Sequence, residues 1–301
     1  MRDKPTIAIA IGDPAGIGPE ISLKAARDPA VRSACKPLLV GDAGVLQRQA
    51  AACGIAADLH VIARPADAEW SQARLNVLDC AQPDLAGLAF GTTGAASGRA
   101  SLAFARAAIK AALAGEADAV VAAPQNETSI ALAGIRFDGY PSFVARETGT
   151  DEDDVYLMLC FDAVKIVHAT LHRSVRQAID MITRERIERA IGATDRALRR
   201  MGTAAPKIAV GGLNPHAGEG GLFGREEIDI IKPAIDAAAA RGLAVNGPHG
   251  ADTLFHRQGD AFIVMLHDQG HIAAKLAAQK TVAALTIGSP ILFSSVAHGS
   301  A

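Results

Sequence analysis

Three histidines are the residues whose type and placement could do chemistry. His172, His216 and His267 each follow a short apolar run that is predicted to be a strand, and each opens a loop. Because the carboxyl ends of parallel strands meet at one edge of a sheet, the three rings could converge there. Three neutral imidazoles that leave coordination positions open form a catalytic divalent-metal site. The three lie far apart in the chain and have no local spacing signal, so unrelated loop histidines are the alternative.

The loop around His216 is rich in glycine. Residues 211–224 contain six glycines among fourteen residues and follow an apolar run at 208–210. Ordering glycine is costly in backbone entropy, which makes sense where the chain must turn sharply or approach a ligand closely. Asn214 and Glu219 stand beside His216 and could act with it. The alternative is an ordinary surface loop with a solvated histidine.

The segment after His267 carries further polar side chains. Lys275 follows eight residues later, two turns along a predicted helix. There it could bind an anionic substrate or, with a lowered pKa, move a proton, and an exposed helix lysine is the alternative. Asp268 could orient an imidazole or cap the helix. We expect His271 to face solvent and His168, inside a predicted strand, to be a hydrogen-bonded core residue.

The elements that would position these residues alternate between strands and helices. Residues 6–11 predict a strand that leads through a glycine-rich turn at 12–20 into a helical pattern. That turn could present backbone N–H groups to an anion, or it could be a tight structural turn. Buried strands at 37–40 and 119–122 continue the rhythm. With half of its residues hydrophobic and only 4% aromatic, the chain is predicted to form an α/β fold with a parallel sheet.

The composition excludes several classes of partner. The 301 residues include 30 basic and 32 acidic side chains, a formal net charge of −2 and no long basic run, which argues against nucleic acid. No apolar stretch approaches the roughly 18 residues of a membrane span, and the N-terminal apolar run is too short for a signal peptide. The four cysteines form no CxxC pair, as expected for reduced thiols. We therefore expect a soluble, cytoplasmic protein.

Several motifs together resemble the family of 4-hydroxythreonine-4-phosphate dehydrogenase (PdxA). They are GDPAGIGPE at 12–20, GLNPHAGEG at 212–220, ADTLF at 251–255 and HDQG at 267–270. The resemblance implies an isocitrate/isopropylmalate-dehydrogenase-like fold, with two α/β lobes and a central cleft. We expect a cofactor-side lobe of residues 1–124 plus 268–301 and a metal and dimerisation lobe of residues 125–267. The resemblance also implies a homodimer with a shared active site, and it places the family's metal-binding histidines on His172, His216 and His267.

Other positions depart from that family. Its substrate-binding His-Thr pair falls on Tyr140-Pro141, its Asn on Ala284 and its Arg on Phe293, whereas its Lys is kept as Lys275. Losing an imidazole and a guanidinium removes donors that a phosphorylated substrate would need. Gln125-Asn126 stand where the branch typified by terephthalate cis-dihydrodiol dehydrogenase tends to have histidines. The chain is otherwise most similar to that branch, through residues 139–142, 166–175, 265–272 and 294–301.

We therefore expect an NAD-dependent oxidative decarboxylation of a cis-dihydrodiol aromatic carboxylate, with NADP as the alternative cofactor. A divalent metal is implied, zinc first, with Mg, Mn, Co or Fe as alternatives. Tyr140, Asn214 and Lys275 are the candidate substrate-binding residues, and Lys275 and Asp252 are the candidate catalytic residues for proton transfer. One alternative is 4-hydroxythreonine-4-phosphate dehydrogenase or a related phospho-sugar-acid dehydrogenase, with a phosphate clamp from Arg136, Arg146 or Lys280. Another is a binding or sensor protein that has kept the fold and lost turnover.

Overall fold

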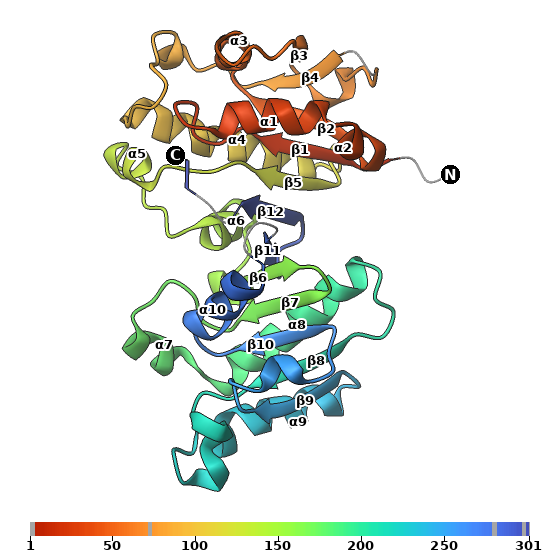
Figure 1. Cartoon of the computed structure of the whole chain (residues 1–301), viewed down its shortest axis with the longest axis vertical. Coiled ribbons are helices and arrows are strands. Elements are labelled where there is room, and N and C mark those ends of the chain that lie inside the picture. The colour runs from red at the N-terminus through yellow and green to blue at the C-terminus, as the bar shows by residue number, and fades with distance from the viewer. Residues whose placement is uncertain (1–3, 72–73, 279–281, 297–298, 301) are drawn as a thin grey trace. The chain divides into compact units, whose positions relative to one another are not determined.

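The computed structural model describes residues 4–71, 74–278, 282–296 and 299–300 (Figure 1). The chain divides into two compact units. The first unit is formed by Met1–Thr148 with Pro290–Ala301, and the second unit by Gly149–Ser289. These boundaries differ from the expected lobes of 1–124 plus 268–301 and 125–267.

Two packing arrangements account for the difference. Helix α6 (Tyr140–Thr148) packs on α4 (Ala95–Leu113), which keeps the segment after residue 124 with the first unit. Strand β11 (Ala283–Ile287) pairs antiparallel with β6 (Tyr156–Phe161), which keeps the segment after residue 267 with the second. Neither contact can be predicted from the alternation of strands and helices along the sequence.

The first unit is built on a parallel sheet, as predicted. Its strands lie in the order β3-β4-β2-β1-β5-β12, and each neighbouring pair is parallel. The strands are β1 (Thr6–Ala10), β2 (Lys36–Gly41), β3 (Asp58–Ile62), β4 (Arg74–Asp79), β5 (Ala119–Ala122) and β12 (Leu292–Val296). The other helices are α1 (Gly18–Arg27), α2 (Pro29–Ala34), α3 (Ala43–Ala52) and α5 (Glu127–Leu132). The core is mostly alanine, valine, leucine and isoleucine, which suits helices packed on a parallel sheet.

The second unit has a mixed sheet in the order β11-β6-β7-β10-β8-β9. Strand β6 is antiparallel to both of its neighbours, whereas β7, β10, β8 and β9 are parallel. The remaining strands are β7 (Val164–His168), β8 (Lys207–Gly211), β9 (Ala244–His249) and β10 (Ala261–Val264). The helices are α7 (Val175–Met181), α8 (Arg184–Arg200), α9 (Lys232–Ala240) and α10 (His267–Ala277). In the described part of the chain, no helix is both long enough and apolar enough to cross a membrane.

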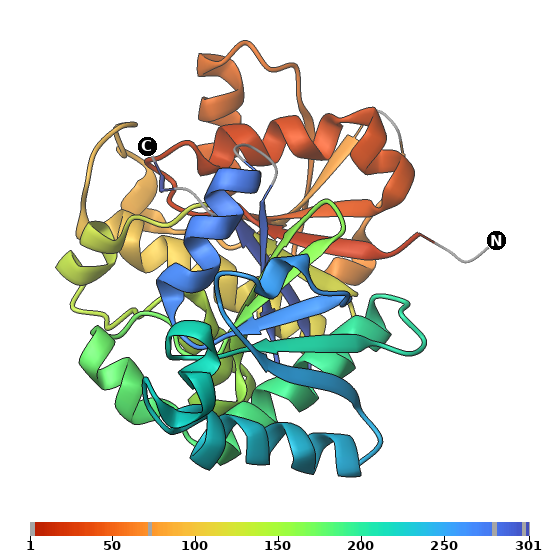
Figure 2. The same ribbon diagram turned by 60° about the horizontal axis from the view of Figure 1, so that its bottom comes forward.

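The two faces of the second sheet are covered by different helices. Val210 and Ile263 belong to the core cluster that includes α8 and α9. The adjacent residues Ala209 and Phe262 point to the other face and belong to the cluster that includes Ala274 of α10. Helix α10 and helix α9 therefore lie on opposite faces (Figure 2). Helix α10 begins at His267, shortly after the carboxyl end of β10.

The turn after β1 is a structural turn. The N–H of Ala15 donates to the buried Asp13 carboxylate at 2.8 Å, and the N–H of Gly16 donates to Asp13 O at 3.1 Å. The N–H of Ile17 donates to Ser300 O at 2.9 Å. Burial raises the pKa of Asp13. The N–H groups that an anion would need are thus paired within the chain, which supports the structural alternative for this turn.

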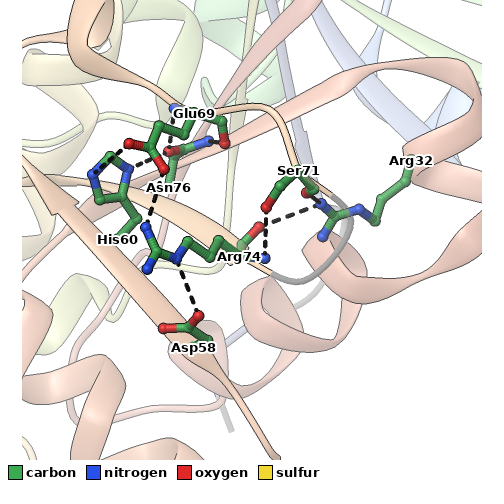
Figure 3. Close-up of polar contacts among 7 residues, drawn as sticks. All are labelled: Arg32, Asp58, His60, Glu69, Ser71, Arg74 and Asn76. Atoms are coloured by element: carbon green, nitrogen blue, oxygen red, sulfur yellow. Dashed lines mark hydrogen bonds and ion pairs between the residues drawn. The ribbon is translucent and has the colours of Figure 1, made fainter.

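A polar network holds the outer strands β3 and β4 to the segment between them (Figure 3). The buried Asn76 side chain accepts the N–H of Glu69 at 3.0 Å, donates to Glu69 O at 2.9 Å and lies 3.0 Å from His60 Nδ1. Arg74 pairs with Glu69 at 3.0 Å and with Asp58 at 3.2 Å. The positive Arg74 side chain pairs with two carboxylates, so the network stabilises the edge of the sheet.

Candidate active site

His172 and His267 are brought together by the parallel pairing of β7 and β10. Beyond the ends of these strands, the buried hydroxyl of Thr170 donates to Met265 O at 2.6 Å. The two following loops therefore leave the sheet side by side. The ring centroids of His172 and His267 lie 5.8 Å apart.

The ring of His267 is oriented by the next residue. His267 Nδ1 lies 2.6 Å from Asp268 Oδ1, and this hydrogen bond holds the pKa of the carboxyl below its usual range. Because a carboxylate only accepts, Nδ1 carries the hydrogen, and in the neutral ring this leaves the lone pair on Nε2. Of the two roles considered for Asp268, orienting an imidazole is the one that the structure supports. Partners of this kind fix the tautomer and direction of a metal-binding histidine.

Gln269 ties the start of α10 to the glycine-rich loop. Its Oε1 accepts the N–H groups of Met265 and Leu266 at 2.9 and 3.0 Å, and its Nε2 donates to Gly212 O at 3.2 Å. Sequence reasoning missed this residue. The available signal was glutamine at the third helical position, which commonly bonds back to the helix start.

Two further histidines join the cluster. His271 stacks on His267 with centroids 3.8 Å apart, and its Nδ1 lies 3.1 Å from Nε2 of the buried His168. His168 Nδ1 in turn lies 3.4 Å from Leu157 O. That carbonyl can only accept, so Nδ1 carries the hydrogen in both rings and His271 Nε2 is left as an acceptor. The expectation that His271 faces solvent is wrong, whereas His168 as a hydrogen-bonded core residue is confirmed.

The His168–His271 pair should make the fold sensitive to acid. Burial is the largest cause that lowers the pKa of His168 to about 3 and that of His271 to about 4, whereas an unfolded histidine takes up a proton near pH 6.5. The neutral pair therefore stabilises the folded state fully above about pH 6.5, and this contribution is lost as the pH falls toward about 3. For His168 we expect the free energy of unfolding to fall by up to about 1.4 kcal/mol for each pH unit in this window.

Chemical denaturation at a series of pH values between about 7 and 4 measures that slope. The slope should be shallower in His168→Asn, which removes the buried titrating ring. His256→Ala, a change at an exposed histidine, should leave it as in the wild type. Equal slopes in His168→Asn and the wild type would contradict this origin of acid lability.

His216 lies in a left-handed turn after β8. The backbone φ is 54° at His216, 54° at Ala217 and 44° at Glu219. This conformation costs roughly 1–2 kcal/mol for each non-glycine residue. Such strain is typical of functional sites where the surroundings enforce it. His216 Nδ1 lies 3.2 Å from Glu219 Oε2, which leaves Nε2 as the nitrogen for a ligand.

The side chain of Glu227, which is 2% exposed, holds this loop. It accepts the N–H groups of Leu213 and Asn214, each at 2.7 Å, and Asn214 Nδ2 at 2.9 Å. Asn214 Nδ2 also donates to Glu226 Oε2 at 2.6 Å. The side-chain N–H groups of Asn214 thus hold the loop, and Oδ1 is the atom that Asn214 could offer to a substrate. Sequence reasoning missed Glu227, which lies just beyond the glycine-rich segment 211–224.

Lys275 and Asp252 lie near the histidines of the second unit. Lys275 is exposed on α10 at four-residue spacing from His271 and eight-residue spacing from His267, so the three form one stripe along the helix. Asp252 is exposed close to the turn of His216. A Cβ added to Gly250 would lie 2.7 Å from Asp252 Oδ1 and 3.6 Å from His216 Cα.

Tyr140 belongs to the first unit. Its hydroxyl donates to Ala123 O at 3.1 Å and accepts from Gln125 Nε2 at 2.7 Å, and burial raises its pKa. Its ring packs on that of the buried Phe293, with centroids 5.0 Å apart. The hydroxyl is therefore used within the protein, and the ring is the part that Tyr140 could offer to a ligand.

The described residues contain no group of three His, Cys, Asp or Glu side chains that could hold a metal ion. The structure pairs His172 with His267 and places His216 in its own loop, where its ring lies 6.1 Å from that of Phe223. The donor chemistry nevertheless fits a divalent cation, because His216 and His267 each have a carboxylate at Nδ1 that leaves Nε2 for coordination. A catalytic zinc site typically has three protein ligands, so the two rings that one chain brings together do not complete it.

Known proteins resemble this chain over almost its whole length. A family model described as "Pyridoxal phosphate biosynthetic protein PdxA" matches residues 33–301. A 1,2-dihydroxy-3,5-cyclohexadiene-1,4-dicarboxylate dehydrogenase from Comamonas sp is 42% identical and covers 98% of this chain and 90% of its own length. A protein provisionally named D-threonate 4-phosphate dehydrogenase, from Symbiobacterium thermophilum, is 40% identical and covers 100% of this chain and 90% of its own length.

A solved structure shares the fold. The 4-hydroxythreonine-4-phosphate dehydrogenase from Klebsiella pneumoniae superposes with a TM-score of 0.89 at 40% identity, covering 99% of this chain and 92% of that one. This likeness confirms the predicted isocitrate/isopropylmalate-dehydrogenase-like α/β fold.

Proposed function

Because this chain belongs to the PdxA family and is a dehydrogenase of that family, we propose that it catalyses the NAD-dependent, divalent-metal-dependent oxidative decarboxylation of a cis-dihydrodiol aromatic carboxylate. The substrate would be of the terephthalate 1,2-cis-dihydrodiol type. The observation that carries the proposal is the pair of His172 and His267, with rings 5.8 Å apart and Nδ1 of His267 fixed by Asp268. The similarity to the cyclohexadiene-dicarboxylate dehydrogenase supports this choice of substrate.

The packing around Tyr140 favours this substrate over a phosphorylated one. Tyr140 and Phe293 occupy positions where the family resemblance implies an imidazole and a guanidinium, and their rings pack on each other. A phosphate group needs such donors, whereas the apolar faces of a cyclohexadiene ring can pack beside aromatic side chains. Arg136, considered for a phosphate clamp, pairs with Asp138 at 2.8 Å. Lys280, considered for the same clamp, lies outside the described residues.

The metal would be held by His172, His216 and His267. Imidazole nitrogen suits zinc, cobalt and iron, whereas Mg²⁺ and Mn²⁺ prefer oxygen ligands, so zinc is proposed first. In the loaded enzyme the cation would supply Lewis acidity at the substrate oxygens, and NAD or NADP would supply the hydride acceptor. Loss of CO2 from the resulting β-keto acid restores the aromatic ring of the product.

The other predicted residues would bind the substrate and move its proton. Lys275 would bind a substrate carboxylate from the α10 stripe that also carries His267. Asp252, exposed beside the His216 turn, would carry the hydroxyl proton to solvent. Asn214 Oδ1 and the ring of Tyr140 are each proposed as groups that bind substrate.

A second copy of the chain would complete the site. The loops or helices that carry the three histidines also expose large apolar side chains, and these are Val175 (62% exposed), Leu222 (73%) and Leu276 (76%). Large exposed apolar surface is typical of interaction sites. We therefore propose a homodimer in which both copies contribute histidines to each site.

Turnover by the purified protein tests the substrate. With zinc and NAD supplied, the cis-dihydrodiol of terephthalate should give NADH and CO2 in equal amounts. 4-Phosphohydroxythreonine and D-threonate 4-phosphate are the matched alternatives, and we expect no NADH from either. NADH formation from a phosphorylated acid alone would contradict the proposed substrate. Protein without a stoichiometric divalent ion and without turnover of any of the three would favour a binding or sensor protein.

A further inference from the structure

Glu227 lies at the centre of the loop that carries His216. Glu227 is the first residue of the helical turn Glu227–Ile231. Its buried carboxylate accepts three N–H groups, two from the backbone of Leu213 and Asn214 and one from the Asn214 side chain. A buried carboxylate is strongly unfavourable without such partners. The charge and the loop are therefore mutually dependent.

The loop closes around this carboxylate at two glycines. A Cβ added to Gly212 would lie 2.9 Å from Glu227 Oε1, and one added to Gly218 would lie 2.8 Å from Glu227 Oε2. Contacts this close leave no room for a side chain unless the carboxylate moves. His216 lies between these two glycines in the sequence, so the backbone before its left-handed turn, at Gly212, and the turn itself, at Gly218, both rest against oxygens of the same carboxylate.

We infer that Glu227 is a positioning residue for His216, which it controls through the backbone of the loop. Without the carboxylate, the N–H groups of Leu213 and Asn214 would be unpaired, and the strained turn would relax toward ordinary backbone conformations. The imidazole would then leave the position in which the turn presents it. The effect on turnover rests on the proposed function of His216, whereas the dependence of the loop on Glu227 does not.

Two substitutions remove the acceptor oxygens of Glu227 to different extents. Glu227→Gln keeps one oxygen for the two backbone N–H groups but turns an NH2 group toward Asn214 Nδ2. Glu227→Ala removes every acceptor. Glu226→Gln is the matched control, because Glu226 Oε2 bonds the Asn214 side chain at 2.6 Å while Glu227 accepts the backbone N–H groups of Leu213 and Asn214.

Amide hydrogen exchange in the metal-free full chain measures the loop directly. We expect the N–H groups of Leu213 and Asn214 to exchange at least about tenfold faster in Glu227→Ala, less so in Glu227→Gln, and at the wild-type rate in Glu226→Gln. Exchange in α4 of the first unit should not change. Wild-type protection of Leu213 and Asn214 in Glu227→Ala overturns the inference. Equal acceleration throughout the chain also overturns it, because that marks a general loss of stability.

A double-mutant cycle connects the loop to the ring. Zinc affinity and kcat/KM should each fall roughly 10- to 100-fold in Glu227→Gln, the range seen when partners of a metal ligand are removed. In a His216→Ala background, where turnover is lost, the same substitution should cause no further loss of the residual zinc affinity. Zinc affinity decides the question even if none of the tested substrates is turned over, so failure of the proposed function is distinguishable. Additive losses in the cycle overturn the inference.

Discussion

Replacing His267 by alanine should abolish stoichiometric zinc binding and lower kcat/KM at least about a thousandfold, because a divalent cation contributes several kcal/mol to stabilising charge on substrate oxygens. His267 has the most fully determined environment of the three predicted ligands. Asp268 fixes its Nδ1, His271 stacks on its face, and the ring of His172 lies 5.8 Å away. The His267→Ala substitution leaves the ring of His172 without this neighbouring ring.

Zinc titration of the metal-free protein and steady-state kinetics with the dihydrodiol check this result. Asp268→Asn should have a smaller effect, roughly 10- to 100-fold, because it disturbs the orientation of the ring without removing the ligand. His256→Ala, at an exposed histidine remote in sequence from the cluster, should behave as the wild type. Wild-type zinc affinity in His267→Ala would remove this residue from the metal site and leave the proposed chemistry without its central ligand.

The parallel core was predictable from the sequence because it depends on local pattern. The apolar run at 6–11 forms β1, and the runs at 37–40 and 119–122 lie in β2 and β5. The division between the units was not accessible in this way, since it depends on which distant strand β11 joins. Its antiparallel pairing with β6 sets residues in register that are more than a hundred positions apart, and no sequence period records that choice.

The site was predictable as a set of residue types and much less as an arrangement. His271 looked solvent-facing because α10 was considered alone. Its ring in fact turns toward His168 on a neighbouring strand, where Gly270 allows the approach: a Cβ there would lie 2.4 Å from His168 Nε2. The glycine content of the His216 loop correctly indicated a tight conformation. It could not indicate that His216 itself is left-handed, because glycine is the residue that normally adopts such values.

Leu276→Asp should convert the protein to an inactive monomer. Leu276 is 76% exposed and lies on α10 together with His267. Burying a leucine contributes about 1.5–3 kcal/mol, and in a two-fold symmetric dimer the change occurs twice, so the dissociation constant should rise by at least about a hundredfold. Sedimentation measures the change in mass, and Leu132→Asp is the control because Leu132 is 60% exposed but lies on α5 of the first unit. A monomeric wild type, or an active monomeric variant, would contradict a shared site.

Complementation between inactive variants tests the sharing itself. Suppose that each site takes His172 and His267 from one copy and His216 from the other. A heterodimer of His267→Ala with His216→Ala then has one site that lacks both rings and one site that keeps all three. Random exchange of equal amounts should restore about a quarter of the wild-type activity, because half of the dimers are mixed and each has one intact site. If all three ligands came from one chain, every site in the mixture would lack a ring and no activity would return. The close pairing of His172 with His267, and the separate placement of His216, lead us to expect the restored activity.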